Sequence, residues 1–497
     1  MSATLWRGQT IRRRADIQRT LIERDHGPFA TALYGALWLL RWALWAALMG
    51  LWGLVYVPPV GAVVALLIVT GLVLGPWGVS VIAALAAGGA WAWARWSPGT
   101  WARYLVRRGE RFWRRLRYRW VWDDVMAACG IKATDAAHRI VVPRLVWVGL
   151  GDHVDVLTVQ LCPGVTLDTI AAQADGLRSE WAALDVRVTR HPRVRTWGLL
   201  RVVLHDTLAE QQHHARNRVD LTRLPIGRRE DGEPWALRLL GRHLLVAGAS
   251  GAGKGSIVTA LLWALSPAIA DGWVRVIGVD PKGGMEFGMY PELLHMFAWR
   301  SEAELVAALE HAAALTMARC ESLQGRTRLH RPTIDDPFHI IVVDEIASLT
   351  SYIVDRALKE RGRVALGTLL SKGRAAGFSV VGLVQDPRKE VLELRNLFTV
   401  KVGLRLDSRN EVAMVLGDSA HDRGARCEDI DLDTPGVAYV VDDEDRREPI
   451  KVRADFHDDA GMRWLATEYA SPTHEGVPEL VTKQRDTKRP DKRTDAS

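Results

Sequence analysis

One short segment limits the fold of this chain more than any other. An apolar run, His243–Ala247, leads into a glycine-rich loop, Gly248–Ser256, and a second apolar run, Ile257–Leu265, follows at once. Glycines let a backbone bend tightly enough to aim several N–H groups at one anion, and the first turn of a helix adds more of them. The segment predicts a strand, a phosphate-binding loop and a helix.

Every residue of this loop is a candidate contact for ATP. The residues are Gly248, Ala249, Ser250, Gly251, Ala252, Gly253, Lys254, Gly255 and Ser256. The ammonium of Lys254 would lie against the β- and γ-phosphates, but the motif usually continues with Ser or Thr as a Mg²⁺ ligand, where this chain has Gly255. Either Ser256, the next hydroxyl, takes that role through a shifted loop, or the metal site is weakened.

A third apolar run, Phe338–Val343, ends in Asp344 and Glu345, and Asp344 comes 90 residues after Lys254. The run predicts a buried strand with two carboxylates at its end. Asp344 would hold Mg²⁺ through water, and Glu345 would orient and deprotonate the attacking water. The alternative is a strand that ends in two acids by chance. The glycine-rich loop upstream argues against that alternative.

A fourth apolar run, Phe378–Val384, ends in Gln385, which would lie beside the γ-phosphate and sense it. Arg374 precedes this run and is a candidate arginine finger for a neighbouring subunit's site, with a solvated helical arginine as the alternative. Strands and helices alternate over residues 221–456. This alternation is typical of an α/β fold with a doubly wound parallel sheet.

The segment Phe29–Ala94 has a single charged residue, Arg41. A bilayer needs about 20 apolar residues per helix, so two or three spans fit, with turns possible at Pro58–Pro59 and Gly75–Gly78. Arg95 to Arg119 holds nine arginines against one glutamate, and the N-terminal tail is also basic. Both flanks should stay cytoplasmic, which predicts two transmembrane helices in a hairpin; a buried hairpin in a soluble protein is the alternative.

The motifs together resemble the FtsK/SpoIIIE family of hexameric double-stranded DNA translocases. Besides the segments above, the resemblance rests on Leu224-Pro-Ile-Gly, Gly232-Glu-Pro, Val279-Asp-Pro-Lys282-Gly, Lys372-Gly-Arg-Ala-Ala-Gly377, Asp407-Ser-Arg409 and Pro435-Gly-Val-Ala-Tyr439. Upstream, Leu161-Cys-Pro-Gly164-Val and Asp185-Val-Arg-Val resemble the family's small domain. The single motor and the Gly-Lys-Gly-Ser loop are most similar to the FtsK-like conjugal transfer proteins, the TraB/TraSA group, of actinobacterial plasmids and integrative elements.

This resemblance implies a RecA-like P-loop motor domain that uses ATP and Mg²⁺, binds double-stranded DNA and assembles as a homo-hexamer. It supports Arg374 as the finger, because Arg374 lies 11 residues before Gln385, as the family's arginine does. It also places Asp280 and Lys282 near the nucleotide or the DNA, and Arg409 at a subunit contact. The alternatives are a protein-exporting ATPase of the same type, a coupling protein for single-stranded DNA, and a membrane scaffold that does not hydrolyse ATP.

The expected domains follow shifts in composition along the chain. They are a basic cytoplasmic tail at 1–28, a membrane segment at 29–96, a basic aromatic juxtamembrane linker at 97–138, a small α/β domain at 139–220, the motor at 221–456, and a tail at 457–497 that is disordered at its end. The small domain should contain strands at 139–148 and 154–161 and a helix at 167–184. The expected location is the cell membrane, multi-pass, with a cytoplasmic motor.

The net charge and the positions of the cysteines narrow the kinds of binding partner and of metal or disulfide site to be expected. The formal net charge of +7 indicates an acidic partner, either nucleic acid or anionic lipid. The basic aromatic run Tyr104–Trp120 favours anionic lipid because of its place beside the membrane, with nucleic acid as the alternative. The cysteines, Cys129, Cys162, Cys320 and Cys427, are scattered without a CxxC pair, which argues against a zinc site or a disulfide framework.

Overall fold

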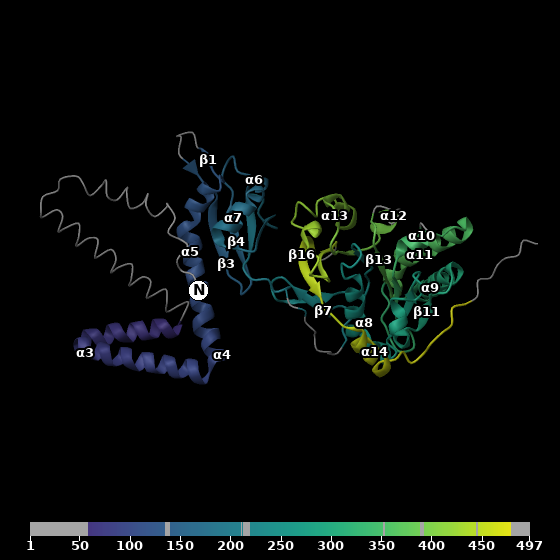
Figure 1. Cartoon of the computed structure of the whole chain (residues 1–497), viewed down its shortest axis with the longest axis horizontal. Coiled ribbons are helices and arrows are strands. Elements are labelled where there is room, and N and C mark those ends of the chain that lie inside the picture. The colour runs from purple at the N-terminus through teal and green to yellow at the C-terminus, as the bar shows by residue number, and fades with distance from the viewer. Residues whose placement is uncertain are drawn as a thin grey trace, which may run out of the picture. The chain divides into compact units, whose positions relative to one another are not determined.

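A computed structural model describes residues 58–134, 140–209, 211, 219–350, 353–387, 392–443 and 446–478 (Figure 1). The chain divides into two compact units, Met1–His205 and Asp206–Ser497. The predicted boundary after residue 220 is therefore too late. The Thr207 hydroxyl donates to the Glu230 carbonyl at 2.9 Å, and the Arg453 guanidinium donates to the Leu208 carbonyl at 2.6 Å, so this stretch is fixed to the second unit.

The described chain begins with an apolar helix, α3 (Pro58–Trp96), which breaks at Gly75, where φ is 68° and ψ is −164°. Glycine adopts such a conformation readily, and the break falls in the segment Gly75–Gly78 that the sequence indicated as a turn. Within the described residues, one helical segment, Trp77–Trp96, is long and apolar enough to cross a membrane. The rest of the predicted hairpin, residues 29–57, lies outside the described residues.

The helical path continues through α4 (Pro98–Trp101) and a π-helical turn (Ala102–Val106) into α5 (Arg107–Ala128). The small domain is an antiparallel sheet with the order β3-β4-β6-β5. Its strands are β3 (Arg144–Gly149), β4 (Val154–Gln160), β5 (Asp185–Arg190) and β6 (Trp197–Val203), its helices are α6 (Leu167–Ala172) and α7 (Ala174–Trp181), and β1 (Ala133–Thr134) pairs with β2 (Ile140–Val141). The strand predicted at 154–161 is confirmed as β4, whereas the strand predicted at 139–148 is divided between β2 and β3, which lie in different sheets. The helix predicted at 167–184 is divided at Gln173 into α6 and α7.

Helix α5 corrects the prediction of a linker over residues 97–138. Tyr118, Trp122, Val125 and Met126 on this helix lie buried in the core of the small domain. Arg114 on the same helix contacts the buried carboxylate of Asp155 at 3.1 Å. The small domain therefore includes α5, and part of the arginine-rich run is paired with protein rather than left free for lipid or nucleic acid.

The second unit is built on a ten-stranded sheet with the order β11-β10-β12-β13-β9-β14-β15-β16-β7-β8. Six neighbouring strands are parallel: β11 (Met296–Ala298), β10 (Val274–Val279), β12 (Phe338–Val343), β13 (Phe378–Val384), β9 (Leu244–Ala247) and β14 (Val400–Gly403). Antiparallel pairing adds β15 (Val437–Asp442), β16 (Arg446–Ala454), β7 (Leu224–Arg229) and β8 (Pro234–Leu237). The sheet is thus mixed, whereas the alternation of elements predicted a parallel one.

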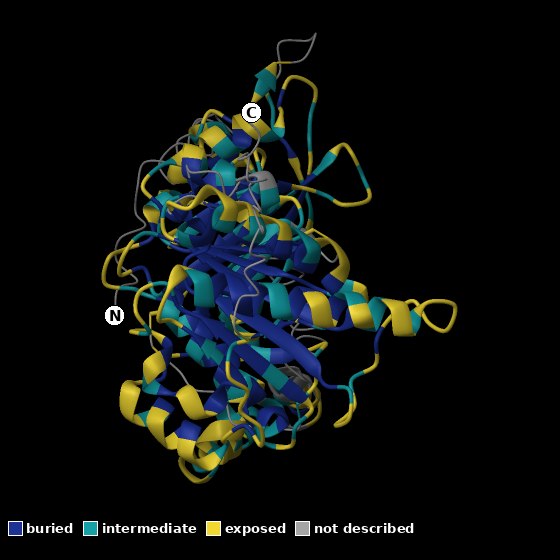
Figure 2. Ribbon diagram, turned by 90° about the vertical axis from the view of Figure 1, so that its right-hand side faces the viewer, coloured by how far each residue is buried: buried dark blue, intermediate teal, exposed yellow. Residues whose placement is uncertain are grey.

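Helices cover both faces of this sheet, and Figure 2 shows its strands buried between them. Leu245 and Ala247 of β9 lie in a core with α9 (Glu302–Leu323), α11 (Arg356–Ala376) and α13 (Arg409–Leu416), and shorter helices α10 (Ile346–Thr350) and α12 (Leu392–Arg395) lie between these in the chain. Leu244 and Val246 lie in a second core with α8 (Lys254–Ala270) and α14 (Asp459–Glu468). Alternate strand residues point to opposite faces, so β9 is apolar throughout.

The predicted tail begins within this unit. Met462 and Leu465 of α14 are buried against the sheet, and the Ser471 N–H donates to the Glu292 carbonyl at 2.7 Å. The motor unit therefore continues past residue 456, through α14 and the segment after it. Residues 479–497, the end predicted to be disordered, lie outside the described residues.

Candidate functional site

The glycine-rich loop joins the carboxyl end of β9 to the amino end of α8, as predicted. Gly251 and Gly253 have φ values of 73° and 95°, which L side chains rarely adopt. A Cβ on Gly253 would also lie 2.2 Å from the backbone nitrogen of Gly436, so only glycine fits there. The loop is held in one shape by its surroundings, and the first turn of α8 leaves N–H groups without intrahelical partners for an anion.

Lys254 is folded into the loop. Its ammonium donates to the carbonyls of Gly248 at 2.7 Å and Ala249 at 3.1 Å, and its side chain is buried. Burial lowers the pKa of Lys254, and Lys282 acts in the same direction, while the carboxylates around it act against both. The cation thus lies where phosphate would lie against the loop.

Asp344 and Glu345 follow β12, which pairs with β10 on one side and with β13 on the other. Both carboxylates are buried, and Asp344 Oδ2 lies 2.7 Å from the Lys282 ammonium. Glu345 Oε2 accepts the N–H of Gln385 at 3.2 Å, whereas Glu345 Oε1 has no hydrogen-bond partner among the described residues. Burial raises the pKa of Glu345, and Lys282 and two backbone N–H groups oppose this rise. The structure therefore brings Glu345 and Gln385 together, as predicted.

The loop after β10 supplies charged groups whose contacts could not be read from the sequence motifs. Asp280 is fully buried, and its carboxylate accepts the N–H groups of Lys282 and Glu286, both at 2.9 Å, and of Phe287 at 3.3 Å. Asp280 therefore shapes this loop rather than facing a ligand. The loop presents Lys282 to Asp344 and Glu286 to the start of α8.

Glu286 is a site residue that the motif reading missed. A Cβ on Gly255 would lie 3.5 Å from Glu286 Oε2. Burial and the neighbouring Asp344 raise the pKa of Glu286, while Lys282 lowers it. Ser256 faces another direction, since a Cβ on Gly436 would lie 3.8 Å from Ser256 Cβ. The missing hydroxyl at position 255 was the one sequence signal for an unusual ligand here.

Arg374 lies near the end of α11, at the amino edge of the parallel strands. Its Nε donates to the carbonyl of Gly241 at 2.9 Å, and Gly241 precedes β9. Gln385 and Glu345 lie at the carboxyl ends of β13 and β12, so the full length of the strands separates Arg374 from the loop of its own chain. Within one subunit, the structure does not bring Arg374 to the other predicted site residues.

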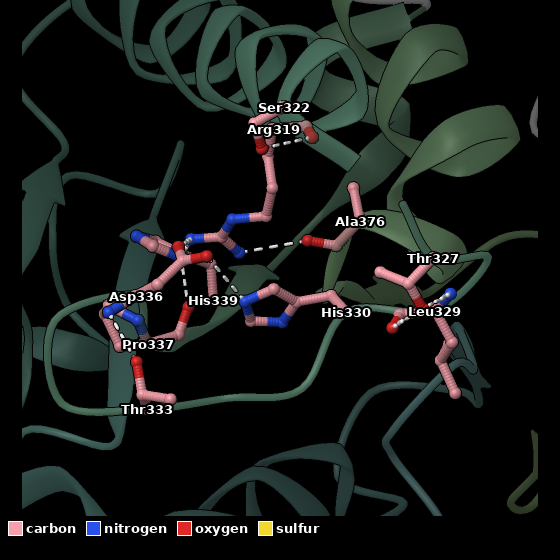
Figure 3. A network of polar contacts seen from close by, with 10 residues as sticks. All are labelled: Arg319, Ser322, Thr327, Leu329, His330, Thr333, Asp336, Pro337, His339 and Ala376. Atoms are coloured by element: carbon pink, nitrogen blue, oxygen red, sulfur yellow. Dashed lines mark hydrogen bonds and ion pairs between the residues drawn. The ribbon is translucent and has the colours of Figure 1, made fainter. Parts of the chain in front are cut away.

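The turn directly after Arg374 is held by a polar network (Figure 3). The Arg319 guanidinium donates to the Ala376 carbonyl at 3.0 Å. The backbone N–H of His330 donates to the Ala375 carbonyl at 2.9 Å, and the backbone N–H of His339 donates to the Gly377 carbonyl at 3.0 Å. Asp336 completes the network through an ion pair with Arg319 and a hydrogen bond with His330 Nε2. Three successive carbonyls after Arg374 are thus fixed by three separate segments of the chain.

The arrangement at the carboxyl edge fits a nucleoside triphosphate with Mg²⁺. The loop offers N–H groups and an ammonium to phosphate, and Glu345 Oε1 is a buried acceptor without a partner among the described residues. Within the described part of the chain, no three His, Cys, Asp or Glu side chains gather to hold an ion by themselves. The carboxylate of Asp344 is an oxygen donor of the kind that Mg²⁺ takes together with substrate phosphates.

These features define a P-loop nucleotide-binding domain of the α/β class. Residues 207–334 match the model of the FtsK/SpoIIIE family, so the chain carries a domain of that family, and the resemblance drawn from its motifs is confirmed.

The chain is similar to several known proteins. Transfer protein TraSA from Streptomyces ambofaciens is 26% identical over 359 residues, which are 65% of this chain and 84% of that protein. DNA translocase FtsK from Campylobacter jejuni is 24% identical over 217 residues, 40% of this chain, and the match spans only 22% of FtsK. Among solved structures, the pCW3 conjugation coupling protein TcpA with ATPγS aligns at 16% identity and a TM-score of 0.47, covering 69% of this chain and 96% of that one.

Proposed function

We propose that this protein is a membrane-anchored ATPase that moves double-stranded DNA, during conjugative transfer of a plasmid or an integrative element between cells. The observation that carries the ATPase part is the position of Glu345. Its carboxylate is buried, one of its oxygens has no partner within the described ranges, and Gln385 joins it to the strand beside the phosphate-binding loop. The names of its relatives, a transfer protein and DNA translocases, support DNA as the cargo.

In this proposal each group has a defined task. The loop residues 248–256 and Lys254 bind the phosphates of ATP. Asp344 is the carboxylate that would hold Mg²⁺, which would stabilise charge on the phosphates, while the sequence-based candidate Ser256 faces Gly436. Glu345 takes a proton from the attacking water, because burial raises its pKa and makes it a stronger base than an exposed carboxylate. Gln385 senses the γ-phosphate, and its backbone N–H links it to the carboxylate of Glu345.

Arg374 acts in this scheme on the site of the adjoining subunit of a ring, which we take to be a homo-hexamer. Its place at the edge of the sheet opposite its own loop supports action between subunits. The apolar segment Trp77–Trp96, together with the apolar residues before it in the sequence, supports integral anchoring of the ring, with the motor in the cytoplasm.

The test is ATP turnover by the full chain in detergent micelles, with and without linear double-stranded DNA at low salt. We expect double-stranded DNA to stimulate turnover several-fold, and stimulation to fall as salt rises, because contacts to phosphate release counterions. Glu345→Gln should lower turnover by roughly 10²–10⁴ while leaving ATP binding intact.

Other outcomes separate the alternatives. Stimulation by single-stranded DNA alone would favour a single-strand coupling protein. Turnover that responds to no DNA would favour protein export. ATP binding without turnover in the unmodified chain would favour a scaffold that does not hydrolyse ATP.

A further inference from the structure

The start of α8 lacks the hydroxyl that this loop type normally offers to Mg²⁺. A Ser or Thr after the lysine supplies that oxygen, and this chain has Gly255 there. A side chain at position 255 would point at Glu286, because a Cβ on Gly255 would lie 3.5 Å from Glu286 Oε2. The direction in which an oxygen ligand is expected is therefore already taken by a carboxylate oxygen from another loop.

The placement of Glu286 is built into the fold. Its N–H and that of Phe287 both donate to the buried carboxylate of Asp280, at 2.9 and 3.3 Å. Phe287 is itself buried in the core beneath α8. The backbone of Glu286 is thus fixed on both sides, and its side chain extends from a rigid support toward the loop.

The alternative donor, Ser256, lies elsewhere. Consecutive helical residues project about 100° apart, so residues 255 and 256 of α8 face different neighbours. Ser256 lies beside Gly436, at the turn that leads into β15, away from the acidic side of the loop. The charged groups that surround Glu286 are Asp344, Lys282, Asp280 and Lys254.

We propose that Glu286 provides the Mg²⁺ ligand that Gly255 cannot, so that Glu286 and Asp344 form a two-carboxylate site completed by the phosphates of ATP. A separate observation supports a ligand at this edge of the sheet: Oε1 of Glu345, the residue after Asp344, is buried and has no hydrogen-bond partner among the described residues. Two carboxylates plus phosphate oxygens match the oxygen donors that Mg²⁺ prefers. This inference rests on the proposed use of ATP and names a further residue for it.

The experiment measures the binding of a fluorescent ATPγS analogue to the full chain in detergent, once with Mg²⁺ and once with EDTA. The quantity of interest is the ratio of the two affinities. Glu286→Gln keeps the shape of the side chain, and we expect it to lower the Mg²⁺-dependent gain about tenfold or more. Glu292→Gln, six residues later, is the matched control and should leave the ratio unchanged.

Electrostatic repulsion between Glu286 and ATP gives a different result from metal binding. If Glu286 only repelled phosphate, Glu286→Gln would raise affinity equally in Mg²⁺ and in EDTA and leave the ratio unchanged. Electron paramagnetic resonance of Mn²⁺ with ATPγS provides a second readout, and free Mn²⁺ should increase in the Glu286→Gln variant. An unchanged ratio together with unchanged Mn²⁺ binding overturns the proposal.

A rescue variant sharpens the test. Gly255→Ser restores the usual hydroxyl, and its Cβ would make only ordinary contact with Glu286. In the double variant Gly255→Ser, Glu286→Gln, we expect much of the lost Mg²⁺ dependence to return. If Ser256→Ala, rather than Glu286→Gln, removed the Mg²⁺ dependence, Ser256 would be the ligand and Glu286 would not.

Failure of this inference can be told apart from failure of the proposed function. If the unmodified chain does not bind the ATPγS analogue at all, the proposed ATPase is wrong. If it binds with a normal Mg²⁺ dependence that Glu286→Gln does not alter, only the role of Glu286 is wrong.

Discussion

The two edges of the parallel strands in the motor unit use charged residues in opposite ways. At the carboxyl edge, Lys254, Lys282, Asp344 and Glu345 face one another around a loop, and at least one of their oxygens has no partner in the described part of the chain. At the amino edge, the Arg319 guanidinium and the backbone N–H groups of His330 and His339 hold three successive backbone carbonyls. The first edge keeps its charges available for a ligand, and the second uses its polar groups to fix the backbone.

This difference shows why burial of charge alone does not identify a site. Both edges contain buried ionisable groups, and His243 is as buried as Asp344. The partners distinguish the two edges: the Ala376 carbonyl held by the Arg319 guanidinium is a structural contact, whereas the Asp344 carboxylate pairs with the Lys282 side chain and can exchange that partner for a substrate. Arg374 is the exception, because it belongs to the structural edge and is proposed to act in catalysis.

Arg374 therefore gives the largest expected effect. An arginine finger contributes about 10³–10⁵ in rate, so we expect Arg374→Ala to lower DNA-stimulated turnover by at least 10³. The finger should act between subunits. Two differently tagged forms of the full chain, Arg374→Ala and Glu345→Gln, are co-expressed, purified through both tags and assayed for ATP turnover.

The mixed rings distinguish action within a subunit from action between subunits. Each variant alone lacks one essential group at every site. In mixed rings, a site with an intact Glu345 receives an intact Arg374 from its Glu345→Gln neighbour, and turnover should return in part. Doubly tagged rings without turnover would show that Arg374 does not serve the adjoining site.

The carboxyl edge could largely be predicted from the sequence, because each of its groups directly follows an apolar strand. Parallel strands end at the same edge of a sheet, so Gly248, Asp344 and Gln385 had to meet there once their strands were recognised. Glu286 could not be placed in this way. It lies in an irregular loop, and its position depends on three backbone N–H groups that converge on the buried Asp280.

The amino edge could not be predicted, since Arg319, His330 and His339 come from three segments with no shared motif. The role of α5 was missed for a different reason. Its arginines dominate the composition, but Tyr118, Trp122, Val125 and Met126 recur at intervals of one helical face, which is the pattern of a buried stripe. The antiparallel half of the large sheet also escaped prediction, because β7 pairs with β16 from the far end of the unit.

The second prediction tests whether the amino edge is structural. Arg319→Met removes the donor to Ala376 and the cation that lies 4.6 Å from the Phe378 ring, so we expect a loss of about 2–3 kcal/mol in local stability. Hydrogen exchange of the β13 amides measures this locally, which suits a chain of two units. Glu345→Gln, at the other edge, should leave the same amides as protected as before.

A matched control keeps this comparison interpretable. Arg326→Met alters an exposed arginine in the same region, and such surface changes usually stay within about 0.5 kcal/mol. Equal exchange in Arg319→Met and Arg326→Met would contradict a structural role for the network. A strong effect of Glu345→Gln on β13 would contradict the division between the two edges.

The smallest expected effect is a pH dependence confined to the amino edge. His243 Nδ1 accepts the Val380 N–H at 3.0 Å, and burial, with Arg374 beside it, lowers the pKa of His243 to about 3. Burial also lowers the pKa of His330 and of His339. These rings stay neutral in the folded chain at a pH where the unfolded chain, with a histidine pKa near 6.5, binds protons.

The direction of the pH dependence of stability follows from the difference in histidine pKa between the folded and the unfolded chain. The stability that depends on neutral His243 is complete above pH 6.5 and is lost as the pH falls, because only the unfolded chain gains the proton. At pH 5 one such histidine costs about 2 kcal/mol relative to pH 7.5. Exchange of the β13 amides, corrected for intrinsic rates, should reveal the loss, and His243→Asn, which keeps an acceptor but does not titrate, should make the dependence shallower. A dependence as steep as before in His243→Asn would mean that other groups set it, and that His243 is not a titrating part of the amino edge.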